Sequence, residues 1–509
     1  MPGPAIRGPL QSTGILTRMN LRPLAASLVL LAASGLTPGA AQQALFHVEE
    51  LVHHPTQDGA VLALVPAQPL HLVVAWGSDE SLGFQTPLIV AQPDRLLEIP
   101  LSTPNPGREI VYRVFVREAN GPRPLHRVPT LPPRGTPFSF GVAADTHAYA
   151  VWSKGVCGNS SPPLLQLKKT LQNIRNDDAL RFLVLGTDIA MTKCGSCVAC
   201  QVDGEAVSSK TISSFNDALL RWRRVLQTDL LGAVGADLPL LTVLGDHEAE
   251  QGWAPQDERV WSERARRLHV PLANDTYSGG PAGRYYAVEA GDLLLVVLDV
   301  HRQTNVQPST PDAWTLGRAQ RAWLEQTLAG SSATFKLVTA EHLVGGLFDP
   351  SVAVQKGRGG ITATDDGTPT GTFVGEQAEL HELFVAHGVQ VFLSYQDHVS
   401  AWGEKLGPDG QGDGVTYVMG GRASGVSPPA AGLPWYQEAM DYDGDGTPEF
   451  DTNVTGSRKV GYFRVTVEPD TRLLFEYVQT VTTLGGGANG TVLYAFAVDL
   501  DGHPSQVTP

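Results

Sequence analysis

The chain has 509 residues, which is too many for one hydrophobic core, so the length predicts two or three domains. Its hydrophobic content of 42%, with 54 glycines and 37 prolines, is typical of a globular protein with many turns. The formal net charge of −15, without any run of lysine and arginine, argues against a protein that binds nucleic-acid phosphates.

Residues 1–41 have the pattern of a secretory signal peptide. A short basic region at Arg22 precedes an apolar stretch over residues 24–36, and small residues follow up to Ala41. The apolar stretch is too short for a stable membrane span, and no later stretch is long and apolar enough. We therefore expect a secreted or periplasmic protein that is cleaved near Ala41 and has no stable membrane span.

Between residues 45 and 135, short β-strand patterns alternate with turn residues. Examples are the segments VLALVPA, LHLVVAW and IVYRVFVRE, and no helical period occurs among them. Short strands at this spacing predict a small antiparallel β-sandwich. The proline-rich segment TLPPRGTP at residues 130–137 is typical of a linker.

From residue 136 to residue 483, apolar strands alternate with helical segments such as SPPLLQLKKTLQNIRND and TLGRAQRAWLEQTLAG. This alternation predicts an α/β domain whose sheet is covered on both faces. Three glycines at 485–487 then lead to a short strand, so residues 484–509 form a C-terminal strand and tail. The predicted fold class is an α/β domain preceded by an all-β sandwich domain.

Five apolar strands of the α/β region end in side chains that can bind a metal ion. They deliver Asp145 with His147, then Asp188, then Asp246 with His247 and Glu248, then His342, and finally Gln396 with His398. One such ending is ordinary, because an aspartate often caps a helix and a single histidine is often a core residue.

Five such endings at the strand ends of one open sheet, where functional sites form, indicate a mixed oxygen and nitrogen site. That ligand set suits Fe, Zn or Mn ions, singly or as a pair. Two ions about 3.5–4 Å apart can clamp the attacking and leaving oxygens of a phosphoryl transfer. The strand ends therefore predict a metal site with phosphoester chemistry.

The order of these endings resembles the calcineurin-like metallophosphoesterases, whose pattern is D-x-H, G-D, G-N-H-E/D, a single histidine and G-H-x-H. Within them, the chain is most similar to the branch related to purple acid phosphatases, through segments such as PPRGTPFSFGVAADTH and RYYAVEAGDLLLVVLDV. The resemblance implies a fibronectin-like N-terminal domain and a layered sandwich of mixed β-sheets flanked by helices.

The resemblance also assigns the ligands of the first metal. They are Asp145, His147 and His398, with Asp188 as the carboxylate that bridges to a second metal. The segment LSYQDHV matches a family ending of the form L-S-G-H-D-H-V. A shifted register would place Ser400 at the second histidine of that ending, but fewer neighbouring residues match in it.

The departures from the family pattern fall on the second metal. Its ligands would be Asp246, His342 and Gln396, and the family has Asn in place of the first and His in place of the last. His247 would bind no metal and would stabilise charge on the phosphoryl and leaving oxygens. Three outcomes remain open: a dinuclear enzyme with an altered second metal, a mononuclear enzyme, and a site that has lost its activity.

The chain has four cysteines, and three of them lie close together after the predicted bridging aspartate. They are Cys157, Cys194, Cys197 and Cys200. In an exported chain, an even number of cysteines predicts two disulfides. The C-x₂-C-x₂-C spacing leaves a zinc or iron–sulfur site as the alternative.

The segment DYDGDGTPEFD has the D-x-D-x-D-G spacing of a calcium-binding loop. Its candidate ligands are Asp441, Asp443, Asp445, Thr447 and Glu449, within an insert over residues 441–452. The usual glutamate at the twelfth position is Thr452, so that ligand is absent or comes from elsewhere. The alternative is a solvated acidic loop.

Together these patterns predict a secreted metal-dependent phosphoesterase of the acid-phosphatase type. Its substrate would be a phosphomonoester, with phosphodiesters as the second class, attacked by metal-activated water. The alternative from another class is a non-enzymatic binding protein that is stabilised by metal and has a degenerate second site. The sequence does not determine the oligomeric state.

Overall fold

A computed structural model provides the structure of this protein. It describes residues 44–103, 105–119, 121–147, 162–190, 200–202, 205–207, 211–248, 250, 256–270, 280, 283–302, 316–341, 376–395, 398, 400–406, 412–424, 450–451, 459–482 and 488–509. All of them lie in the unit formed by residues 44–509.

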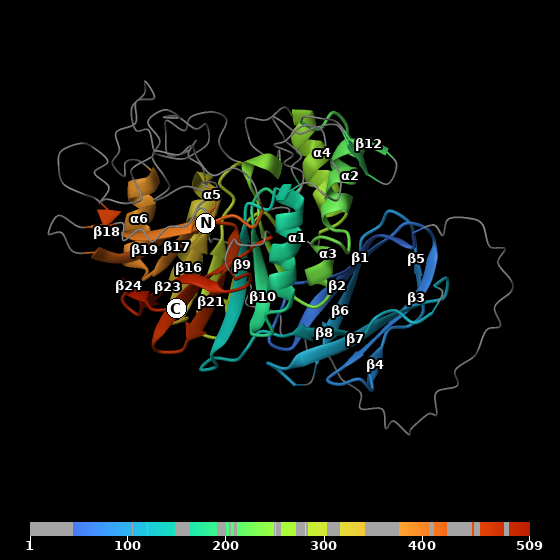
Figure 1. Ribbon diagram of the computed structural model, residues 1–509, viewed down its shortest axis with the longest axis horizontal. Coiled ribbons are helices and arrows are strands. Elements are labelled where there is room, and N and C mark those ends of the chain that lie inside the picture. Colours follow the sequence, from blue (N-terminus) through green and yellow to red (C-terminus); the bar gives the residue numbers. More distant parts are fainter. Residues whose placement is uncertain are drawn as a thin grey trace, which may run out of the picture. The chain divides into compact units, whose positions relative to one another are not determined.

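A ten-stranded sheet runs through this unit (Figure 1). In spatial order its strands are β24 (Pro504–Val507), β23 (Val492–Asp499), β22 (Arg472–Gln479), β21 (Gly461–Glu468), β9 (Phe138–Ala144), β10 (Leu180–Gly186), β13 (Leu240–Val243), β1 (Phe46–His53), β2 (Gly59–Pro66) and β6 (Leu97–Ser102). Its central strands β9, β10 and β13 are parallel, and Gly186 pairs with Ala144 on one side and Val243 on the other. The carboxyl ends of these three strands are therefore level at one edge.

A second sheet packs against the first. Its strands in spatial order are β14 (Tyr286–Ala290), β15 (Leu293–Val297), β16 (Phe335–Thr339), β17 (Val391–Ser394), β19 (Gly412–Gly420), β18 (Ser400–Leu406) and β20 (Phe450–Asp451). Strands β15, β16, β17 and β19 are parallel. Phe140 and Phe182 of the first sheet share a buried cluster with Leu295 and Leu337 of the second.

Helices cover the outer faces of both sheets. On the first sheet lie α1 (Pro162–Arg175), α2 (Phe215–Val225), α3 (Gly232–Gly235) and α4 (Gln256–Arg267), and on the second lie α5 (Gly317–Gly330) and α6 (Glu376–Ala386). Leu183 of β10 faces the helices, whereas its neighbours Phe182 and Val184 face the second sheet. Both faces of β10 are thus apolar, as a strand buried on two sides requires.

The N-terminal region is all β, as the sequence predicts. A five-stranded sheet is formed by β4 (Phe84–Gln85), β3 (Leu70–Gly77), β7 (Glu109–Val116) and β8 (His126–Pro129), with β5 (Ile89–Ala91) paired to β3. It packs on β1, β2 and β6 through a buried cluster that includes Leu62, Val74 and Tyr112. A short hairpin, β11 (Cys200–Val202) with β12 (Glu205–Val207), completes the strands.

The N-terminal region and the α/β region share the ten-stranded sheet. Strand β1 pairs with β13 in parallel, at His53 and Leu240. The ring of His53 contacts the carbonyl oxygen of Leu240 through Nδ1 at 3.2 Å. The exact domain boundaries at residues 135 and 483 stay predictions, while the predicted α/β fold class with mixed sheets flanked by helices is confirmed.

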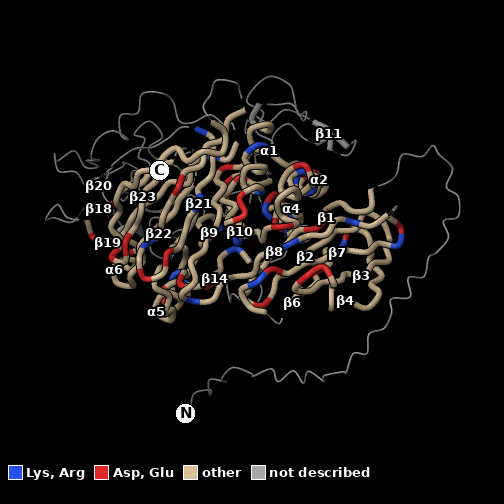
Figure 2. Tube along the Cα trace, turned by 60° about the horizontal axis from the view of Figure 1, so that its bottom comes forward, with Lys and Arg blue, Asp and Glu red and all other residues tan. Residues whose placement is uncertain are grey.

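Charged residues of both signs are interspersed along the described chain (Figure 2). Among the described residues, no helix combines the length and apolar character that crossing a membrane requires.

Candidate metal centre

Four of the side chains predicted to bind the first metal lie together at the carboxyl edge of the sheets. We call Asp145, His147, Asp188 and His398 the first cluster, because one ligand atom from each lies within 4.8 Å of the others. Nε2 of His147 is 2.8 Å from Oδ2 of Asp188, and Nε2 of His398 is 3.6 Å from Oδ1 of Asp145. The contact of His398 with Asp145 supports the register in which this histidine serves the first metal.

Asp188 also belongs to a second group of ligand atoms. Together with Asp246 and His247 it forms what we call the second cluster, again with ligand atoms within 4.8 Å of one another. Oδ1 of Asp188 accepts a hydrogen bond from the backbone N–H of His247 at 3.3 Å. The shared carboxylate has the place that a bridging ligand between two cations would need.

The backbone is strained at the residues of the first cluster. Positive φ angles occur at Asp145 (45°), His147 (39°), Asp188 (52°) and His398 (56°), and also at Thr187 (50°). Each such conformation of a non-glycine residue costs about 1–3 kcal/mol and persists only where the surroundings enforce it. The strained residues lie at the strand ends where the ligand atoms of the first cluster meet.

The buried carboxylates of this edge fit a bound cation. Asp145 and Asp188 are fully buried, and Oδ2 of Asp145 and Oδ1 of Asp246 are buried without a hydrogen-bond partner among the described residues. A buried carboxylate oxygen with no partner is costly, and a metal ion would satisfy it. Oxygen and imidazole donors together suit Fe, Zn or Mn.

The pKa values of the cluster show how strongly it attracts positive charge. Burial opposes protonation of His147, but the carboxylates of Asp188 and Asp145 outweigh it and raise its pKa to about 10. Burial would raise the pKa of Asp188, but His247, His147 and His398 hold it well below its usual value. The imidazoles thus supply in part the positive charge that a cation would bring.

Glu248 joins the loop after β10, which carries Asp188, to the loop after β13, which carries Asp246. Its carboxylate accepts the backbone N–H groups of Asp188 (3.1 Å), Ile189 (2.6 Å), Ala190 (3.1 Å) and Gly245 (2.7 Å). Burial first, and then the charge of Asp188, raise the pKa of Glu248 to about 8. The loop after β10 is thereby fixed to the loop after β13.

Two buried side chains of the second sheet, Glu341 and His301, reach the same edge and were not predicted. Oε1 of Glu341 accepts the backbone N–H of Asp246 at 2.8 Å, and Oε2 contacts Nε2 of His301. A signal for His301 was present, because β15 is followed by Asp299-Val300-His301, the same D-x-H ending that follows β9. Only Ala340 separates Glu341 from the end of β16, and the predicted ligand His342 follows it.

Several predicted positions lie outside the described residues. They are His342, Gln396, the calcium-loop residues Asp441, Asp443, Asp445, Thr447 and Glu449, and the cysteines Cys157, Cys194 and Cys197. Cys200 begins strand β11, but its side chain is not among those described. The second-metal set, the calcium site and the disulfides therefore stay predictions.

Tyr395 shows how the chain accommodates one departure from the family pattern. It stands where that pattern has glycine, its ring is fully buried, and its hydroxyl oxygen accepts a hydrogen bond from Oγ1 of Thr339 at 2.7 Å. A Cβ atom on Gly186 would lie 2.3 Å from Cε1 of this ring, and one on Gly420 would lie 2.8 Å from Cδ1. The two glycines make the room that the tyrosine fills.

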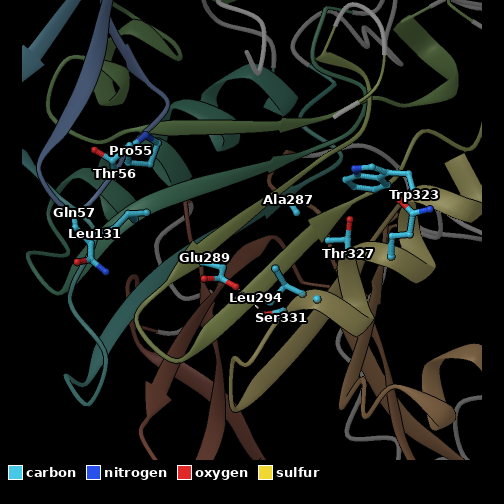
Figure 3. Close-up of a pocket in the computed structure, with 12 residues that line it drawn as sticks. Pro55, Thr56, Gln57, Leu131, Ala287, Glu289, Leu294, Trp323, Thr327 and Ser331 are labelled. Carbon is cyan, nitrogen blue, oxygen red and sulfur yellow. Dashed lines mark hydrogen bonds between the residues drawn. The ribbon is translucent and has the colours of Figure 1, made fainter. Parts of the chain in front are cut away.

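A cavity of about 500 Å³ lies elsewhere in the fold (Figure 3). Its lining includes Gln57 of the loop after β1, Glu289 of β14, and Trp323 and Thr327 of α5. None of the residues of the two clusters contributes to it.

Comparisons with known proteins agree with this geometry. Residues 191–404 match the model of the PhoD-like phosphatase family. The solved structure of PhoD is similar at 17% identity, with a TM-score of 0.67, over 92% of this chain and 93% of that one. Purple acid phosphatase PPD1 from yellow lupin (Lupinus luteus) seeds is similar at 14% identity, with a TM-score of 0.58, over 90% of this chain and 77% of that one.

No curated protein matches the chain significantly. The resemblance stated from the motifs is confirmed, because the chain matches a phosphatase family model and shares its fold with PhoD and with a purple acid phosphatase. The similarity to the PhoD-like phosphatase model over residues 191–404 was not predicted from the motifs. The family match and the shared fold support a hydrolase of the phosphoesterase type.

Proposed function

We propose that this chain, which has the calcineurin-like metallophosphoesterase fold, is an exported metal-dependent enzyme that hydrolyses phosphomonoesters. Phosphodiesters are the second substrate class. The observation that carries the proposal is the fully buried carboxylate of Asp188, which takes part in both clusters of ligand atoms. A shared carboxylate of this kind is what a two-metal phosphoryl-transfer site requires.

The described residues divide into ligands for two cations. Asp145, His147 and His398 would hold the first, Asp246 would hold the second, and Asp188 would lie between them. When bound, such cations polarise the phosphoryl oxygens and lower the pKa of a water molecule so that it can attack phosphorus. The oxygen and nitrogen donors favour Fe, Zn or Mn, and the extra carboxylate of Asp246 favours a harder ion at the second position.

The solvent exposure of the side chains indicates from which side a substrate can reach the metal centre. The side chains of Asp145, Asp188 and His147 are 0–4% exposed, so they form the floor. Those of His247 and Asp246 are 25% and 28% exposed, so their outer edges are open. A phosphoester would therefore approach from the side of His247.

His247 is placed to act on the substrate. Its backbone N–H is held by Asp188, and its ring lies edge-on to the ring of His147 with centroids 5.3 Å apart. From there an imidazole N–H can donate to a phosphoryl or leaving-group oxygen as negative charge develops on it. Removing one such donor typically costs about 10²–10³ in kcat.

Export, disulfides and calcium complete the proposal. Export rests on the signal-peptide pattern of residues 1–41, and disulfides among Cys157, Cys194, Cys197 and Cys200 rest on export and the even number of cysteines. A structural calcium ion at 441–452 rests on the loop spacing alone. Mass spectrometry without reduction that found four free thiols would reject the disulfides.

The experiment measures turnover of p-nitrophenyl phosphate and bis(p-nitrophenyl) phosphate by the protein loaded in turn with Fe, Zn and Mn. We expect metal-dependent hydrolysis, faster for the monoester, and a loss of about 10²–10³ in kcat for His247→Ala. A matched control is His71→Ala, since that imidazole contacts Glu118 at 2.8 Å on the surface of the N-terminal region. A metal-loaded protein that hydrolyses neither compound would favour the non-enzymatic alternative.

A further inference from the structure

A buried carboxylate and a buried imidazole meet where the second sheet approaches the second cluster. Glu341 closely follows the end of β16 and is fully buried, and His301 follows the end of β15 and is 2% exposed. Because β15 and β16 are parallel with Val297 paired to Thr339, their ends are level and these two side chains come together.

The carboxylate of Glu341 connects the two sheets. One oxygen accepts the backbone N–H of Asp246, at 2.8 Å, and the other contacts Nε2 of His301. The backbone carbonyl of Glu341 accepts the N–H of Tyr395 at 2.8 Å, so the end of β17 is joined to the same point.

Gly245 allows this approach. A Cβ atom at that position would lie 2.7 Å from Oδ1 of Asp188 and equally close to Oε1 of Glu341. The absence of a side chain at Gly245 therefore lets the Glu341 carboxylate reach the loop that carries Asp246.

His301 is itself fixed by a chain of hydrogen bonds from helix α5. Its backbone N–H donates to Oδ1 of Asp299 at 3.0 Å. The backbone of Asp299 is held in turn by Gln320, which accepts its N–H at 2.8 Å and donates to its carbonyl at 2.7 Å. The position of the imidazole is thus set by a helix on the outer face of the second sheet.

A buried carboxylate is costly unless it is paired and hydrogen-bonded, and Glu341 has both kinds of partner. A hydrophobic side chain would fill the same interior position without that cost. One contact that such a side chain could not make is the hydrogen bond from the backbone N–H of Asp246, a residue of the second cluster.

We propose that Glu341 and His301 are positioning residues that hold the Asp246 loop and so set the affinity of the second metal position. This inference rests on the proposed function, because it requires a second ion near Asp246. Outer partners of this kind are worth about 10–100-fold in metal affinity.

The test is a calorimetric titration of the metal-free protein with Mn²⁺ and with Zn²⁺, for the wild type and the variants Glu341→Ala, Glu341→Gln and His301→Asn. We expect Glu341→Ala and His301→Asn to bind the second ion about 10–100-fold more weakly and the first ion as the wild type does. Glu341→Gln keeps an acceptor for the Asp246 N–H, so it should retain most of the affinity that the alanine variant loses.

Kinetics provide a second readout that a loss of stability alone would not reproduce. At limiting metal, kcat should fall in Glu341→Ala and return when the metal concentration is raised, with KM unchanged. The matched control is His126→Asn. This variant breaks another histidine–carboxylate contact between distant parts of the sequence, the one of 2.8 Å with Asp237. That variant should lose stability and keep both metal affinities.

Second-ion affinities equal to the wild type in His301→Asn and, if it folds, in Glu341→Ala would overturn the inference and leave the proposed function standing. A wild-type protein that binds a single ion would overturn the two-metal proposal and this inference together. If Glu341→Ala does not fold, the second-ion affinity of His301→Asn decides the question. A loss of second-ion affinity in His126→Asn as large as in His301→Asn would also overturn the inference. The loss of affinity would then result from reduced stability and would not be specific to the Asp246 loop.

Discussion

The Nε2 atoms of His147 and His398 lie 3.1 Å apart, although 251 residues separate them in the chain. Their rings are nearly perpendicular, with an interplanar angle of 85°. Two imidazole nitrogens at this distance repel each other when both are protonated, whereas both can coordinate one metal ion when they are neutral. The contact links the first strand-end motif to the last.

Replacing His398 tests this contact. We expect His398→Ala to weaken binding of the first ion by more than the roughly 10–100-fold that follows the loss of an outer partner. Metal analysis after dialysis against a chelator measures the loss, and His71→Ala serves again as the surface control. First-ion affinity equal to the wild type would show that His398 is no ligand.

The fit of Tyr395 between the two glycines predicts a steric coupling. Gly186→Ala places a methyl group against Cε1 of the Tyr395 ring, and we expect a loss of about 1–3 kcal/mol in the free energy of unfolding. In a Tyr395→Ala background the same substitution should cost little, because the ring is gone. Urea unfolding of the two single variants and the double variant measures the coupling, and purely additive effects would contradict it.

His53, where β1 joins β13, predicts a dependence of stability on pH. Burial, and then the neighbouring His54, lower the pKa of His53 from 6.5 to about 3. The folded chain therefore keeps this ring neutral at pH values where the unfolded chain binds a proton. The contribution of the neutral ring to the free energy of unfolding is complete above pH 6.5 and is lost as the pH falls toward 3.

The measurement is the free energy of unfolding from pH 8 to pH 4 for the wild type and His53→Asn. Below pH 6.5 the wild-type slope should exceed that of the variant by one proton, about 1.4 kcal/mol per pH unit. Burial also lowers the pKa of His269 to about 3, so this residue should still contribute to the pH dependence of the free energy of unfolding in the His53→Asn variant. Parallel curves for the two proteins would mean that His53 is protonated in the folded state.

The altered second-metal set predicts a preference for hard ions. With Asp246 and Gln396 in place of Asn and His, the site has one more negative charge and one imidazole fewer, so it should prefer Mn²⁺, Mg²⁺ or Ca²⁺ to Zn²⁺. We expect Asp246→Asn combined with Gln396→His to raise its affinity for Zn²⁺ or Fe and to keep or increase phosphatase activity. Titration and a chromogenic phosphoester assay would decide it, and a double variant that binds one transition metal and stays inactive would contradict it.

The sequence predicted the first cluster because parallel strands end at one edge of a sheet. Asp145, Asp188 and His398 each follow an apolar strand, so the arrangement of the strands is enough to bring the three side chains together. It did not predict that β1 would join β13, since that pairing links His53 to Leu240 across the chain and leaves no local pattern.

Glu341 and His301 were missed for a related reason. Their role depends on a contact between two sheets, which the strand patterns alone do not determine. The pattern after β15 contained an aspartate and a histidine like those after β9, but no resemblance assigned them a function. Glu248 was noticed within its motif, whereas its hydrogen bonds to four backbone N–H groups became visible only in three dimensions.

The proposed function depends on the carboxylate of Asp188 being shared between two metal ions. The most direct test counts Fe, Zn and Mn per chain in the wild type and in Asp188→Asn, with phosphomonoester turnover measured on the same samples. We expect two ions per chain in the wild type, and the loss of most of both from the variant together with a fall in kcat of about two orders of magnitude or more. An Asp188→Asn protein that keeps both ions and wild-type turnover would contradict the claim.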